Sequence, residues 1–199
     1  MKLCAICFSL SLFDVQLGST VDHDLVNNMV NKTLSTTLVV LILTFVASAQ
    51  EHTSSGWVRL APENAGFTVM VPSKPEEQIT NKESVVTHAY IAKLDRSIVL
   101  TAYTDYTAGV KVDPQIELDA DRDNFNKVLD AKLLTTRNIT LDGRQGIEFT
   151  SETPTANIKS KVFIRGNRVF QQAVLIWKDV DQTKEAETFF DSFAFTTKN

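Results

Sequence analysis

Two dipeptides that favour tight turns, Asp142-Gly143 and Gly166-Asn167, constrain the fold of this chain more than any other feature. Asp, Asn and Gly tolerate the positive φ angles that a two-residue hairpin turn requires. Each dipeptide separates two segments of strand character, and these four segments are Leu133–Leu141, Gln145–Thr150, Ile158–Arg165 and Arg168–Trp177. The sequence therefore predicts two β-hairpins, which would contribute to an antiparallel sheet.

Four earlier segments also have strand character. They are Trp57–Leu60, Phe67–Val71, Val85–Ala92 and Ile98–Tyr106. The tripeptide Asp95-Arg96-Ser97 is expected to turn the chain between the last two segments. Pro72 and Pro75 follow the second segment. Because proline has no N–H to donate to a strand ladder, we expect strand pairing to stop there.

The first helix is predicted from its N-terminus. Asp113 is expected to be the N-cap and Pro114 the first helical residue, where the missing N–H costs nothing. The helix would continue to about Ala131. Its imperfect apolar stripe consists of Ile116, Ala120, Phe125, Val128 and Leu129.

The second helix is predicted from about Gln182, with Asp181 as its cap. Its apolar residues follow the spacing of one helical face, and they are Ala186, Phe189, Phe190 and Phe193. Phe195 would then begin a short terminal strand.

The order of these elements is β-rich, helix, β-rich, helix, which favours an α+β fold over a doubly wound one. We expect a central antiparallel β-sheet of about six to eight strands with two main helices packed on it. The sheet and helices would form a single domain over residues 57–199, and residues 50–56 would be a polar linker.

Several of these features together resemble the PsbP-like superfamily. They are Trp57, Gly66–Pro72, Asp113-Pro114, Asp142-Gly143, Gly166-Asn167 and Phe189–Phe193. That superfamily includes the extrinsic photosystem II subunit and many small exported bacterial proteins of unknown role. The resemblance implies an α/β/α sandwich, but it carries no reaction and no ligand set, because a fold does not determine a function.

Residues 29–49 have the organisation of a secretory signal peptide. Lys32 precedes the apolar run Leu38–Val46, and Ala47-Ser48-Ala49 supplies small residues for cleavage between Ala49 and Gln50. A membrane-spanning helix needs about 20 apolar residues, which is more than this run provides. We therefore expect a periplasmic or secreted protein without a stable membrane anchor after cleavage.

Residues 1–28 fit this signal peptide poorly, because Asp14, Asp22 and Asp24 would precede its apolar run. One hypothesis is that translation starts at Met29 and that residues 1–28 are an upstream extension from a mis-assigned start. The alternative is that residues 3–13 are a separate hydrophobic leader. In both cases the cysteines of the chain lie outside the mature domain.

The composition argues against several functions. A net charge of −4 without a basic block gives no support for nucleic-acid binding. The expected mature chain has no cysteine and no G-x-S-x-G motif, and its histidines are His52 and His88. No serine motif points to either histidine, so we expect a non-enzymatic domain without a cofactor.

The acidic run Asp119, Asp121 and Asp123 is a candidate metal site, because the spacing resembles the start of a calcium loop. Asn124 stands where such a loop needs glycine, and Asp130 replaces the bidentate glutamate. Carboxylates two residues apart on a helix also point to different sides. The alternative is a solvated helix face.

His88, Tyr90 and Tyr103 are candidate ligand-binding residues on one face of neighbouring strands, although ordinary core packing would also explain the tyrosines. Arg165 and Arg168, near Lys159 and Lys161, are interpreted as a solvated strand edge.

The favoured function is an exported binding domain for a protein, such as an envelope or extracellular protein, or for another envelope component. The alternative is a small-ligand or calcium-binding module. A hydrolase with an unrecognised set of residues has no positive support. A pocket with convergent polar groups would favour a ligand, and an exposed apolar patch would favour a protein partner.

Overall fold

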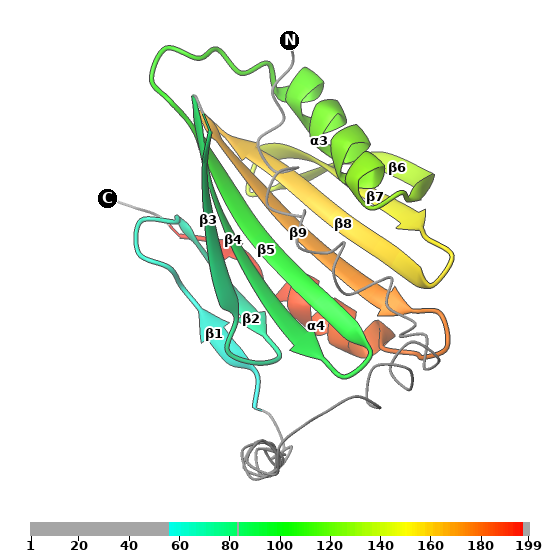
Figure 1. The fold of residues 1–199 in the computed structure, drawn as a ribbon. Helices are drawn as coiled ribbons and strands as arrows, with labels where there is room; N and C mark the ends of the chain where they lie inside the picture. The colour runs from blue at the N-terminus through cyan, green and yellow to red at the C-terminus, as the bar shows by residue number, and fades with distance from the viewer. Residues whose placement is uncertain (1–55, 83, 197–199) are drawn as a thin grey trace, which may run out of the picture. The chain divides into compact units, whose positions relative to one another are not determined.

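The computed structural model describes residues 56–82 and 84–196, so the predicted signal peptide, its cleavage site and residues 1–28 lie outside the described residues. A seven-stranded antiparallel sheet has the strand order β3-β4-β5-β9-β8-β7-β6 (Figure 1). Its strands are β3 (Glu76–Lys82), β4 (Val85–Leu94), β5 (Ser97–Tyr106), β6 (Lys132–Leu141), β7 (Arg144–Glu152), β8 (Ala156–Arg165) and β9 (Arg168–Trp177). The predicted antiparallel α+β architecture is confirmed.

Both predicted hairpins are present, and their turns use the expected residues. Asp142 and Gly143 have φ angles of 50° and 74°, and Gly166 has a φ of 61°. β6 pairs with β7 around the first turn, and β8 pairs with β9 around the second. Because the turn fixes the register of a hairpin, each turn also determines which residues share a sheet face.

A smaller three-stranded sheet has the order β1-β2-β10. It is formed by β1 (Val58–Leu60), β2 (Phe67–Val71) and β10 (Ala194–Phe195). β2 pairs with β10, so the beginning of the domain is joined to its end. The short terminal strand at Phe195 is therefore confirmed.

Two helices, α3 (Pro114–Val128) and α4 (Thr183–Asp191), cover opposite faces of the large sheet (Figure 1). Phe125 of α3 contacts Phe149 of β7, whereas Phe193, just after α4, contacts Phe163 of β8. Phe163 is paired with Gly146, three residues from Phe149, so the two contacts lie on opposite faces. The result is an α/β/α sandwich. No helix among the described residues is long and apolar enough to cross a membrane.

The N-terminus of α3 is as predicted, but its buried face is not. The Asp113 carboxylate accepts a hydrogen bond from the Ile116 backbone N–H at 3.1 Å. Ile116 itself is 49% exposed, so placing it in the buried stripe was wrong. The inner face carries Leu118, Asp121 and Phe125. Because one of these buried residues is an aspartate, the inner face does not show the regular spacing of apolar residues by which a buried helix face is predicted, and this explains the error.

Strand β3 was not predicted, because pairing was expected to stop at Pro72 and Pro75. Pairing resumes directly after Pro75, and all of Glu76–Lys82 pairs with β4. The prolines precede this strand and so remove no bond from its ladder. As the edge strand of the sheet, β3 is largely exposed and polar, and it lacks the alternation by which the other strands were found.

The apolar face of α4 is confirmed, with Ala186, Phe189 and Phe190 buried. The N-cap is Gln182, and its side chain makes no cap hydrogen bond, so Asp181 is not the cap residue. The Asp181 carboxylate nevertheless accepts from the Thr183 backbone N–H at 3.0 Å and thereby satisfies one N-terminal donor of the helix.

Phenylalanine rings fill the space between α4, the small sheet and the large sheet. The ring centroid of Phe193 lies 5.2 Å from that of Phe195, 5.4 Å from that of Phe67 and 6.1 Å from that of Phe163. Phe170, which is fully buried, is 6.1 Å from Phe67. We call these five residues the phenylalanine cluster. It joins elements from both ends of the domain to the middle of the sheet.

Replacing Phe193→Ala is expected to lower the free energy of unfolding by about 3–5 kcal/mol, because it removes a buried ring that contacts four others. Ile116→Ala on the exposed side of α3 is the control and is expected to change stability by less than about 0.5 kcal/mol. Denaturant unfolding measures both. A large loss for the Ile116 variant would instead support the apolar stripe predicted from the sequence.

Candidate functional site

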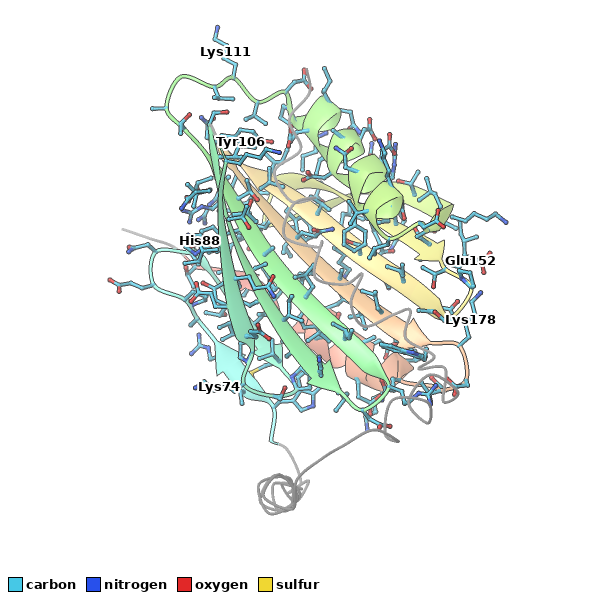
Figure 2. All side chains as sticks on the ribbon, in the orientation of Figure 1. Lys74, His88, Tyr106, Lys111, Glu152 and Lys178 are labelled. Atoms are coloured by element: carbon cyan, nitrogen blue, oxygen red, sulfur yellow. The ribbon has the colours of Figure 1, made fainter. Side chains whose placement is uncertain are left out.

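A cleft of about 410 Å³ opens where the chain leaving β1 lies against β3, β4 and β5. It is lined by Arg59, Leu60, Ala61, Pro62, Glu63, Glu77, His88, Tyr90 and Tyr103. We call it the tyrosine cleft. It brings together the three candidate ligand-binding residues from the sequence, and His88 projects from the sheet near the β3 edge (Figure 2).

Strand register places these side chains. His88 is paired with Tyr103 across β4 and β5, and Tyr90 lies two residues further along β4 on the same face. Glu77 of β3 is paired with Tyr90. Glu77 was not identified from the sequence, because it belongs to the strand that was not predicted.

A hydrogen-bonded group centred on Glu77 occupies one wall of the cleft. One carboxylate oxygen, Oε1, accepts from the Tyr90 hydroxyl at 2.8 Å and lies 3.3 Å from Nδ1 of His88. The hydrogen bonds from Tyr90 and His88 lower the pKa of Glu77 below its ordinary value. Burial, together with the bond to Glu77, raises the pKa of Tyr90 far above its ordinary value. Glu77 is therefore ionised and Tyr90 protonated at neutral pH.

The Tyr103 ring lies between a histidine and an arginine. The His88 ring stacks on it with centroids 4.6 Å apart and an interplanar angle of 6°. The Arg168 guanidinium carbon is 4.7 Å from the Tyr103 ring centroid. His88 comes from β4 and Arg168 from β9, the two strands that flank β5. Burial raises the pKa of Tyr103, although the positive charge of Arg168 opposes this.

Arg168 also ties the loop before β2 to the large sheet. Its guanidinium binds both carboxylate oxygens of Asp105 at 2.6 Å and donates to the carbonyl oxygens of Asn64 and Ala65 at 2.6 and 2.7 Å. The prediction that Arg168 lies on a solvated strand edge was wrong, because β9 is an interior strand. Bidentate binding of this kind gives fixed geometry, so the loop beside the tyrosine cleft is held rigidly.

The acidic residues of α3 do not converge. Arg122 binds Asp119 at 2.9 Å and Asp123 at 2.8 Å. Asp121 is buried on the inner side of the helix, away from these two exposed side chains. Across residues 56–82 and 84–196, no group of three histidine, cysteine or acidic side chains is placed to hold a metal ion. The metal site at Asp119, Asp121 and Asp123 remains a prediction without supporting geometry.

A second cleft, also of about 410 Å³, lies between the end of α4 and strands β6 to β9. It is lined by Arg137, Ile139, Thr140, Leu141, Glu148, Lys161, Phe163, Gln172, Phe190, Asp191 and Phe193. We call it the Gln172 cleft. Sequence reasoning missed this cleft because its residues come together only through pairing and helix packing.

A row of polar side chains crosses the large sheet on the face that carries both clefts. In register from β6 to β3, the row consists of Arg137, Glu148, Lys161, Gln172, Thr101, Tyr90 and Glu77. Its two ends line the two clefts. In the middle, the hydroxyl of Thr101 and both amide atoms of Gln172 are buried without a hydrogen-bond partner among the described residues. An unsatisfied buried polar group costs about 1–3 kcal/mol.

These features define an α+β sandwich with two clefts on one face of its sheet. The solution structure of cyanobacterial PsbP (CyanoP) from Synechocystis sp. PCC 6803 is similar, with a TM-score of 0.51 and 10% identity over 75% of this chain and 98% of that one. The chain therefore has a PsbP-like fold, as the sequence resemblance implied. At this identity the similarity establishes the fold alone.

A crystal structure from Bacteroides thetaiotaomicron VPI-5482 has a TM-score of only 0.35 and 15% identity, over 70% of this chain and 48% of that one. No protein-family model and no curated protein sequence matches this chain.

Replacing Tyr90→Phe is expected to raise the pKa of the Glu77 carboxyl toward its ordinary value of 4.5, because the carboxylate loses its strongest hydrogen bond. A carbon-detected NMR titration measures this pKa. A carboxyl whose pKa is lowered by folding stabilises the folded state at pH values above its ordinary, unfolded-state pKa. This stabilisation is lost as the pH falls through the folded-state pKa. The wild-type advantage should therefore shrink in acid, and it should be under about 1 kcal/mol because Glu77 is 46% exposed.

Tyr106→Phe is the matched control, because the Tyr106 hydroxyl bonds Glu117 instead. It should leave the Glu77 pKa unchanged. An unchanged Glu77 pKa in the Tyr90 variant would contradict the proposed hydrogen bond.

Proposed function

We propose that this domain is an exported, non-enzymatic binding module that takes a small ligand with hydroxyl or ammonium donors in the tyrosine cleft. The observation that carries the proposal is the ionised Glu77 carboxylate, held by Tyr90 and His88 at the wall of a cleft. Its side chain is 46% exposed, so it remains accessible to a ligand as an acceptor.

The size and the charges of the cleft support this ligand class. Its volume of about 410 Å³ falls within the range of small-molecule sites. Two carboxylates, Glu63 and Glu77, line it together with a single permanent cation, Arg59. Acceptors therefore outnumber permanent positive charges, and this balance favours neutral or cationic ligands rich in hydrogen-bond donors.

Rigidity also supports binding. The bonds from Arg168 to Asp105 and to the carbonyl of Ala65 hold the loop beside the cleft, and the stack of His88 on Tyr103 holds the opposite wall. A site that is ordered before the ligand arrives loses less conformational entropy on binding. The predicted signal peptide at residues 29–49 supports a periplasmic or extracellular location for this module.

A protein or envelope component is the second candidate partner. The observation that favours it is the edge strand β6, where Leu133 and Leu134 are 38% and 48% exposed. An edge strand can pair with an added strand of a partner, and exposed apolar side chains can strengthen that contact. In this alternative the tyrosine cleft would have no part in recognition.

An NMR titration with a panel of sugars, amino sugars and alkyl diamines tests the first candidate. We expect binders in this panel to shift the amide signals of Glu77, His88, Tyr90 and Tyr103. Glu77→Gln keeps an oxygen that can accept from Tyr90 but removes the charge, and it should weaken binding about tenfold.

The matched control is Glu76→Gln, because Glu76 neighbours Glu77 on β3 but points to the opposite face. Its affinity for the same compounds should equal that of the wild type. If no compound in the panel shifts the cleft at millimolar concentration, the ligand proposal fails and the β6 edge becomes the favoured site.

A further inference from the structure

The Gln172 cleft contains a buried amide that the fold leaves unused. Gln172 is 1% exposed, and neither its Nε2 nor its Oε1 has a hydrogen-bond partner among the described residues. The residue nevertheless lines the cleft. Buried amides in folded proteins are nearly always satisfied, so one that faces a cavity is a candidate for binding a ligand.

The neighbouring glutamine, Gln171, differs from Gln172 in the contacts of its amide nitrogen. Gln171 is as buried as Gln172 and points to the opposite face of β9. Its Nε2 donates to the Ser160 hydroxyl oxygen at 3.3 Å, within the sheet face covered by α3. The Gln171 amide therefore has one partner, through Nε2, although its Oε1 has none among the described residues, whereas neither amide atom of Gln172 has one.

Lys161 supplies a positive charge beside this amide. It is paired with Gln172 across β8 and β9, so the two side chains are neighbours on one face. Its ammonium group lies 5.0 Å from the Phe190 ring centroid, and no ion pair involves it among the described residues. Burial lowers the pKa of Lys161, which reflects an ammonium group partly removed from water.

The acidic residue closest in register to Lys161 is already engaged. Glu148 accepts from Arg137 Nε at 2.8 Å and lies 3.5 Å from Lys159 Nζ. Burial alone would raise the pKa of Glu148, but Arg137 and Lys159 lower it below the ordinary value. With Glu148 neutralised by these two cations, Lys161 retains a charge available to an anionic group.

The remaining wall of the cleft is aromatic. Phe163, Phe190 and Phe193 line it, and Phe163 and Phe193 belong to the phenylalanine cluster that fixes their positions. Such a wall favours an apolar group of a ligand over water. Asp191, at the end of α4, adds an acceptor at the same cleft.

We propose that the Gln172 cleft is a second binding site, for a small monocarboxylate with an apolar body and a donor beside the carboxylate, as in an apolar α-amino acid. The carboxylate accepts from Lys161 Nζ and Gln172 Nε2, and the adjacent donor bonds Gln172 Oε1. The apolar body packs against Phe190 and Phe193. A phosphate group, with its higher negative charge, fits less well beside Glu148 and Asp191.

The test is an NMR titration of the purified protein with L-phenylalanine. Amide signals around Lys161, Gln172, Phe190 and Phe193 should shift, and these shifts are followed separately from any at the tyrosine cleft. Phenylacetate, which lacks the amino donor, should bind about tenfold more weakly, and phenethylamine, which lacks the carboxylate, should not shift these signals. Absence of any shift at this cleft with L-phenylalanine would overturn the proposal, whatever the outcome at the tyrosine cleft.

Gln172→Met provides the decisive variant, since it keeps the length of the side chain and removes only the amide. Affinity for L-phenylalanine should fall at least about tenfold, while the melting temperature should rise because an unsatisfied polar group is gone from the core. Gln171→Met is the control and should keep wild-type affinity. Equal affinity in the Gln172 and Gln171 variants would contradict the site. If either variant fails to fold, Lys161→Met must show the same tenfold loss for the proposal to stand.

Discussion

The packing of the phenylalanine cluster is the interaction on which the rest of this structure depends. It attaches α4 and the small sheet, whose strands come from both ends of the domain, to the middle of the seven-stranded sheet. Phe67 contacts Tyr103 on one side of the cluster, and Phe193 lines the Gln172 cleft on the other. Both clefts therefore border the phenylalanine cluster, which lines the Gln172 cleft directly and packs behind Tyr103 of the tyrosine cleft.

The polar row that joins the clefts lies in the same layer as the apolar phenylalanine cluster, where buried polar side chains are unfavourable. The Thr101 hydroxyl and the Gln172 amide are buried in the middle of the row without partners among the described residues, and apolar side chains there would remove this desolvation cost. Buried polar groups without partners are uncommon in folded proteins, and a functional role is one explanation for them. Two of the buried polar atoms without a partner among the described residues belong to Gln172, which lines a cleft where a ligand would supply the missing partners, and this is the reason for proposing a site there.

The sequence predicted what depends on local signals and missed what depends on register. The turn at Asp142-Gly143 and the apolar face of α4 are coded by neighbouring residues, so both were found. Tyr90 and Tyr103 were placed together because alternation and one short turn are enough to align adjacent strands. Glu77 was missed because its strand is polar and lies at an edge. The site at Gln172 could not be found, because its cleft also requires the pairing of β7 with β8 and the packing of α4, which no local pattern specifies.

The protonation states of Glu77 and Tyr90 agree with the proposed role of this pair in binding. A general acid or base works best when its pKa lies near the working pH. The hydrogen bond from Tyr90 lowers the pKa of Glu77, while burial, together with that bond, raises the pKa of Tyr90, so both values move away from neutrality. The bond that holds the pair in place thus fixes one acceptor and one protonated hydroxyl across a wide range of pH. Such constancy serves recognition of a ligand, whereas catalysis by these groups would require one of them to exchange its proton.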